Sequence, residues 1–68
     1  MNIIFNKNFY NLKAIKKAIR AYHELADFRI EENTKTYKIK INNIINEETK
    51  AVIEGEFSNY VLAEMKNE

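Results

Sequence analysis

Two stretches in the middle of the chain alternate strictly between apolar and polar residues. Residues 28–31 run Phe-Arg-Ile-Glu, and residues 37–41 run Tyr-Lys-Ile-Lys-Ile. A period of two with one apolar side is typical of strands that have one buried and one solvated face. The polar segment 32–35 between them predicts an antiparallel hairpin, in which Arg29 and Glu31 pair with the lysines of the second strand.

Two longer segments show the three-and-four spacing of amphipathic helices. Their apolar stripes are Leu12, Ile15, Ile19, Tyr22 and Ala26 in the first and Ile53, Phe57, Tyr60, Val61 and Met65 in the second. Asn11 and Asn46 are the predicted N-caps, and Glu47 and Glu48 suit the positive end of the second helix dipole. A glycine inside a helix costs about 1 kcal/mol relative to Ala. Gly55 therefore predicts one of two features of this helix: close packing at residue 55 or a break there.

Residues 2–6 are rich in β-forming side chains and too few for a helix, so they predict a first strand. The element order is then β-α-β-β-α. We expect a single small α/β domain spanning residues 1–68, of the α+β class. It should be a two-layer sandwich with both helices on one face of a three-stranded sheet. The first strand, helix and second strand could form a right-handed crossover with parallel strands. The strand order stays open, and the two edges of the sheet are natural docking sites for another strand.

Composition limits the chemistry that the chain can perform. Its 68 residues bury only about 60% of the surface exposed on unfolding. There is no cysteine, so disulfides and thiolate ligands are excluded, which suits a reducing compartment. One glycine and no proline exclude a Gly-rich phosphate loop. No apolar run approaches about 18 residues, so we expect a cytoplasmic protein that does not engage a membrane.

Charge is unevenly distributed along the chain. Residues 1–20 hold five cations and no acid, whereas residues 41–68 hold six acids and two lysines. The two ends could attract each other within the fold, which is the interpretation we favour, or the basic first helix could bind a partner. Nucleic acid is disfavoured, because sheet recognition would use outward aromatics and Tyr37 falls on the inward side.

The residues that could support catalysis are few. Ser58 and His23 are the only serine and histidine, and Ser58 lacks the glycine context of a hydrolase nucleophile. His23 and Asp27 are four residues apart, but two ligands do not make a metal site. The acidic pairs at 47–48 and 54–56 suit a solvated helix face. We therefore expect no catalytic residue, no metal and no cofactor.

The last helix contains polar residues where a helix least favours them. Ser58 and Asn59 interrupt an apolar run, although their side chains compete with the helix backbone. Leu62 falls roughly opposite the inward stripe, and Tyr60 is expected in the core with its hydroxyl at the rim. The sequence thus predicts a partner-binding surface formed by Ser58, Asn59 and Leu62.

Residues 56–64, Glu-Phe-Ser-Asn-Tyr-Val-Leu-Ala-Glu, resemble the C-terminal signature of the small HxsD proteins of the His-Xaa-Ser system. That signature has an apolar pair, a short polar pair, Tyr, any residue, Leu and a charged end. The matching residues are Phe57, Asn59, Tyr60, Leu62 and Glu64. The departures are Glu56, Ser58 and Ala63, the last standing where the family favours Arg.

The resemblance implies an accessory role in the maturation of a ribosomal peptide, because the family accompanies radical-SAM enzymes that modify one. It supplies no catalytic residue. It does not imply an iron–sulfur cluster in this chain, which has no thiolate to bind one.

These observations together favour a non-catalytic accessory or binding module, with a protein or peptide partner held on the outer face of the last helix or on a strand edge. By the resemblance, that partner is a radical-SAM enzyme or its substrate peptide. Two alternatives remain open. One is a small nucleic-acid-binding or regulatory protein that uses the basic first helix. The other is a homodimer in which Leu62 and a strand edge are subunit contacts.

Overall fold

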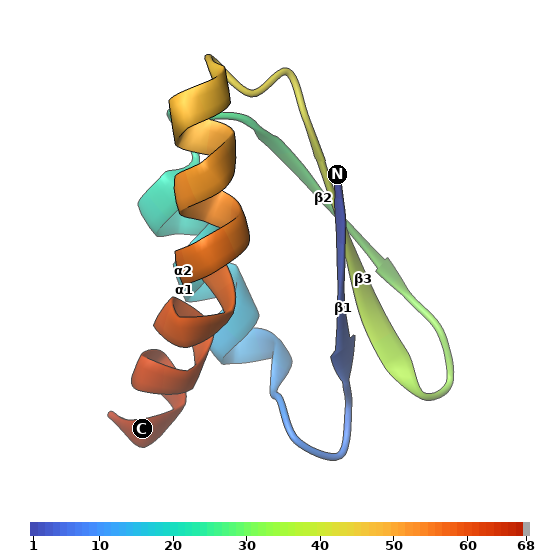
Figure 1. Cartoon of the computed structure of the whole chain (residues 1–68). Coiled ribbons are helices and arrows are strands. Elements are labelled where there is room, and N and C mark those ends of the chain that lie inside the picture. Colours follow the sequence, from blue (N-terminus) through green and yellow to red (C-terminus); the bar gives the residue numbers. More distant parts are fainter. Residues whose placement is uncertain (68) are drawn as a thin grey trace.

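The computed structural model describes residues 1–67 and contains five elements in the expected order. They are β1 (Asn2–Asn6), α1 (Leu12–Tyr22), β2 (Asp27–Glu32), β3 (Thr36–Asn42) and α2 (Glu47–Lys66). Both helices lie on the same face of the three-stranded sheet (Figure 1). The two-layer α+β architecture predicted from the sequence is therefore confirmed. Across residues 1–67, no helix combines the length and apolar character that crossing a membrane requires.

The strand order is β1-β3-β2, and β3 is antiparallel to both of its neighbours. β1 and β2 therefore point in the same direction, as the crossover predicted, but β3 lies between them. In the register, Ile39 of β3 faces Ile3 of β1 on one side and Ile30 of β2 on the other. This arrangement makes β1 and β2 the two edges of the sheet.

The core lies between the inward face of the sheet and the two helices. Its buried side chains are Phe5, Ala14, Ile15, Ala18, Ala26, Ile39, Ile41, Ile53, Phe57 and Val61. In α1 the small residues Ala14 and Ala18 are fully buried, whereas Ile19 is only half-buried. The predicted stripe of α1 is corrected in two respects: its centre includes these alanines, and the helix ends at Tyr22, so Ala26 is buried from the loop before β2.

Both helices begin where an asparagine can cap them. The Oδ1 atom of Asn11 accepts a hydrogen bond from the Ala14 backbone at 2.8 Å, and that of Asn46 accepts one from the Thr49 backbone at 2.7 Å. These bonds satisfy amides that the first turn of a helix leaves without partners. α2 continues unbroken through Gly55, and a Cβ atom added there would meet no atom within 4 Å. Neither predicted reason for the glycine, a break or close packing within the chain, applies.

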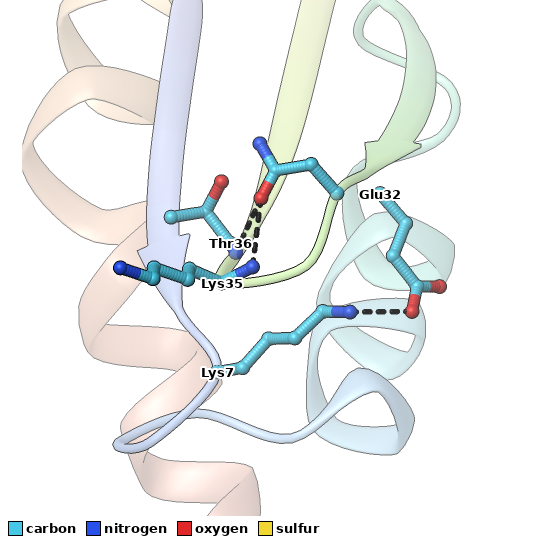
Figure 2. A network of polar contacts seen from close by, with 5 residues as sticks. Lys7, Glu32, Lys35 and Thr36 are labelled. Atoms are coloured by element: carbon cyan, nitrogen blue, oxygen red, sulfur yellow. Dashed lines mark hydrogen bonds and ion pairs between the residues drawn. The ribbon is translucent and has the colours of Figure 1, made fainter.

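The hairpin turn between β2 and β3 is closed by Asn33. Its Oδ1 atom accepts hydrogen bonds from the backbone N–H groups of Lys35 at 2.9 Å and Thr36 at 2.8 Å (Figure 2). Beside the turn, the Lys7 ammonium donates to the Glu32 carboxylate at 2.6 Å. This ion pair links the end of β1 to the end of β2 across the tip of the sheet.

The outer face of β2 and β3 is polar, as the alternation predicted. Lys40 and Glu31 form an ion pair at 3.0 Å across the β2–β3 ladder. The hydrogen bond from Lys40 holds the pKa of the Glu31 carboxyl below its ordinary value, and the Lys40 charge adds to this effect. The expected cross-strand pairing is thus present for Glu31, whereas Arg29 faces Lys40, a residue of like charge, in the register.

Candidate partner-binding surfaces

The edge of β1 presents backbone groups that the sheet does not use. Met1 and Ile41 exchange two hydrogen bonds, of 3.1 Å and 2.8 Å, so they form a hydrogen-bonded pair in the ladder. In an antiparallel ladder such pairs alternate with pairs whose N–H and C=O groups point away from the partner strand. The N–H and C=O groups of Asn2 and Ile4 therefore face outward. Within residues 1–67, no backbone hydrogen bond satisfies them.

The two edges of the sheet differ in charge. β1 contains no charged side chain, and its Ile4 side chain is 63% exposed on the outer face. β2 carries the exposed charged residues Asp27, Arg29, Glu31 and Glu32. Charged side chains are a common means of discouraging further strand pairing at an edge. By this criterion β2 is protected and β1 is not.

The predicted site residues on α2 lie toward its solvent side, but to different extents. Asn59 is exposed and Leu62 is 39% exposed, whereas Ser58 is half-buried. The Asn59 Nδ2 atom donates a 3.3 Å hydrogen bond to the Gly55 carbonyl, one helical turn earlier. Asn59 is thereby oriented along the helix surface.

One continuous stripe of exposed residues runs along α2, opposite the buried residues Ile53, Phe57 and Val61. We call it the outer stripe: Glu48, Val52, Gly55, Asn59, Leu62 and Lys66. Alternating intervals of four and three residues place its members on one face of the helix. It is charged only at its two ends, and its exposed apolar side chains are Val52 at 45% and Leu62.

The solvent side of α1 carries the basic residues. Lys13, Lys16, Lys17 and Arg20 surround an open hollow of about 470 Å³ whose wall includes Leu12. Lys17 lies 3.8 Å from the Glu64 carboxylate of α2. The attraction expected between the two charged ends of the chain is thus limited to one ion pair. Among the described residues, Lys13, Lys16 and Arg20 have no ion-pair partner.

His23 and Asp27, the two residues considered together for metal binding, make separate polar contacts. His23 is exposed at the end of α1, where its Nδ1 atom lies 2.8 Å from the Arg20 carbonyl. Asp27 instead accepts a 2.7 Å hydrogen bond from the Asn43 side chain. Over residues 1–67, no group of three or more His, Cys, Asp or Glu side chains is placed to hold a metal ion.

Two tyrosines join the helices at the rim of the core. The ring centroid of Tyr22 in α1 lies 5.6 Å from that of Tyr60 in α2, and the two rings meet edge to face. It lies 5.7 Å from the ring centroid of Phe57. Tyr60 is half-buried against the core, in the position expected from the sequence. Burial raises the pKa of the Tyr22 hydroxyl above its ordinary value of 10.0, and Glu56 and Tyr60 raise it further.

Sequence patterns alone did not single out Asn2 and Ile4. The available signal was the absence of charge in residues 2–6 beside the four charges of residues 27–32. That contrast acquires meaning only once β1 and β2 are known to be the two edges.

Comparison of the chain with protein-family models, with curated proteins and with solved structures gives no match.

Proposed function

We propose that the protein is a non-catalytic binding module that accepts an extended segment of a peptide or protein partner along the edge of β1. The observation that carries this proposal is the contrast between the two edges. β1 offers outward N–H and C=O groups and no charge, whereas β2 is charged along its length. Addition of a strand to an open edge is a recurrent mode of peptide recognition.

The edge supplies both affinity and selectivity. The outward backbone groups of Asn2 and Ile4 would pair with a partner strand, because each edge residue of this kind offers one donor and one acceptor. The exposed Ile4 side chain would contact a partner side chain on the outer face of the extended sheet. The expected ligand is therefore an extended segment with an apolar residue beside Ile4.

The resemblance of residues 56–64 to the HxsD signature supports a more specific role. On that basis, the extended segment belongs to a ribosomal peptide or to the radical-SAM enzyme that modifies it, and the protein assists the modification without catalysing it. The protein alone should then show no turnover that depends on His23.

A selection from a displayed library of random peptides, followed by binding measurements on edge variants, tests the proposal. Ile4→Pro removes the outward N–H group, while the β1–β3 hydrogen bonds made by the neighbouring residues remain. Ile4→Val keeps this N–H group and serves as the matched control. Selected peptides should bind Ile4→Pro about tenfold more weakly, because a carbonyl group of the peptide loses its donor and the proline ring replaces the Ile4 side chain. They should bind Ile4→Val nearly as well as the parent. Equal binding to both variants would contradict the proposal.

A second candidate function rests on the basic side of α1. Lys13, Lys16 and Arg20 have no ion-pair partner among the described residues and surround an open hollow. This arrangement favours a polyanionic ligand, such as nucleic acid. Affinity for such a ligand would fall steeply with salt, whereas strand addition at β1 would depend on salt only weakly. Binding of a short single-stranded oligonucleotide at two salt concentrations, with Lys16→Glu as the variant, separates the two functions.

A further inference from the structure

The outer stripe of α2 is the second surface whose composition calls for a partner. Its middle is uncharged over three turns, with Val52 and Leu62 exposed, and its ends carry one acid and one base. We propose that this stripe binds a second copy of the same chain, with the two α2 helices packed antiparallel around a two-fold axis. The proposal concerns a different surface from the β1 edge and does not depend on peptide binding.

The charges at the two ends of the stripe determine the orientation of the two helices. In an antiparallel pair whose axis passes beside residue 57, Glu48 of each copy faces Lys66 of the other. The same symmetry places two opposite-charge contacts at the two ends of the interface. A parallel pair would instead bring Glu48 against Glu48 and Lys66 against Lys66. The end charges thus favour one orientation and disfavour the other.

The uncharged middle of the stripe is complementary to itself in the same register. Val52 of one copy faces Leu62 of the other, and Gly55 faces Asn59. Gly55 has open space where a side chain would stand, which leaves room for the Asn59 side chain of the second copy. A glycine inside a helix lowers the stability of that helix. No other part of this chain packs where a Gly55 side chain would stand. Close approach of a second helix would give this residue a structural role.

The size of the stripe predicts a weak dimer. From Glu48 to Lys66 it extends about 27 Å along the helix. A contact through one helix face lies at the small end of protein interfaces, so we expect a dissociation constant on the order of 100 µM.

A dimer would carry two β1 edges, and two linked binding sites increase the apparent affinity for a partner with repeated segments.

Charge reversal at the ends of the stripe tests this inference by sedimentation equilibrium at low salt. Glu48→Lys and Lys66→Glu each replace two attractive contacts by repulsive ones, and each should weaken self-association at least tenfold. The double variant Glu48→Lys/Lys66→Glu should restore self-association, with a dissociation constant within about threefold of that of the parent. An equimolar mixture of the two single variants should associate with each other, because their end charges are again opposite.

Glu47→Lys is the matched control. It makes the same change of charge in the same helical turn, but residue 47 lies outside the outer stripe. It should leave self-association within about twofold of the parent. The double variant Asn59→Ala/Leu62→Ala should weaken self-association while leaving the melting temperature nearly unchanged.

Three results would overturn the inference. The first is a parent protein that remains monomeric at about 1 mM. The second is self-association that responds equally to Glu47→Lys and Glu48→Lys. The third is self-association that is lost in Ile4→Pro and retained in the stripe variants, which would place the contact at the sheet edge. Peptide binding at β1 is measured separately, so either proposal can fail while the other stands.

Discussion

Ile39 is fully buried at the centre of β3, between Ile3 of β1 and Ile30 of β2. Ile39→Asp would place an unpaired carboxylate there, at a cost of several kcal/mol. A chain of this size has a total stability of about 5 kcal/mol or less, so the variant should be unfolded at room temperature. Loss of the cooperative thermal transition, followed by circular dichroism, is the expected result.

Ile4→Asp provides the control for this prediction, because it makes the same substitution at an exposed position of the same sheet. It should cost no more than about 1 kcal/mol, the range of strand propensities. If Ile39→Asp melts as Ile4→Asp does, Ile39 does not occupy the core.

Tyr22 should make the stability of the protein depend on pH in the alkaline range. Its pKa is raised in the folded protein by burial first and by Glu56 and Tyr60 next. Between its ordinary value of 10.0 and the raised value, the folded state therefore binds more protons than the unfolded state. Its contribution to stability is complete below about pH 10 and is lost as pH rises through the folded pKa. The melting temperature should fall less between about pH 8 and pH 11 in Tyr22→Phe than in the parent. An equal fall in both proteins would contradict this assignment.

At the scale of the helix, Gly55 supplies a test that separates fold from association. A Cβ atom at position 55 meets open space in the single chain, so Gly55→Ala should stabilise the folded monomer by about 1 kcal/mol. For a domain of this size that gain corresponds to about 5 °C in the melting temperature. The measurement belongs at dilute protein concentration, where the monomer prevails. Ala63→Gly, at another exposed position of α2, should lower the melting temperature by a similar amount. Destabilisation by Gly55→Ala would mean that position 55 is occupied within the chain.

The sequence patterns predicted the elements well because each pattern is local. Alternation at 28–31 and 37–41 identified β2 and β3 to within one residue, and the two asparagine caps were placed correctly. The packing centre of α1 was less well predicted. Ala14 and Ala18 are buried because small residues allow the helix to approach its neighbours closely, and that approach depends on elements distant in sequence. For the same reason, the position of β3 between the other strands could not be obtained from local patterns.

The candidate surfaces show the same division between local and long-range information. Asn59 and Leu62 could be predicted to lie on the solvent side of a helix, because their positions follow from helical spacing. Ser58 could not be separated from them, since it lies at the boundary of the inward face. The β1 edge required knowledge of the strand order, which identifies Asn2 and Ile4 as members of an outer strand.

At the scale of the whole molecule, a two-layer fold with both helices on one side leaves the other face and both edges of the sheet uncovered (Figure 1). The outer face is polar and partly ion-paired, and the β2 edge is charged. Uncharged surfaces of the molecule include the β1 edge with Ile4 and the middle of the outer stripe of α2. Their separation on different layers would allow one molecule to bind a peptide and a second copy of itself at once.

Amide hydrogen exchange with a selected peptide bound tests the central claim, peptide addition to β1, most directly. In the free protein the amides of Asn2 and Ile4 face solvent and should exchange fast, whereas those of Ile3 and Phe5 point toward β3 and should be protected. Binding should slow exchange at Ile4 and Asn2 by at least about tenfold and leave α1 unchanged. Unchanged exchange at Asn2 and Ile4, with new protection confined to α1 or α2, would contradict binding at the β1 edge.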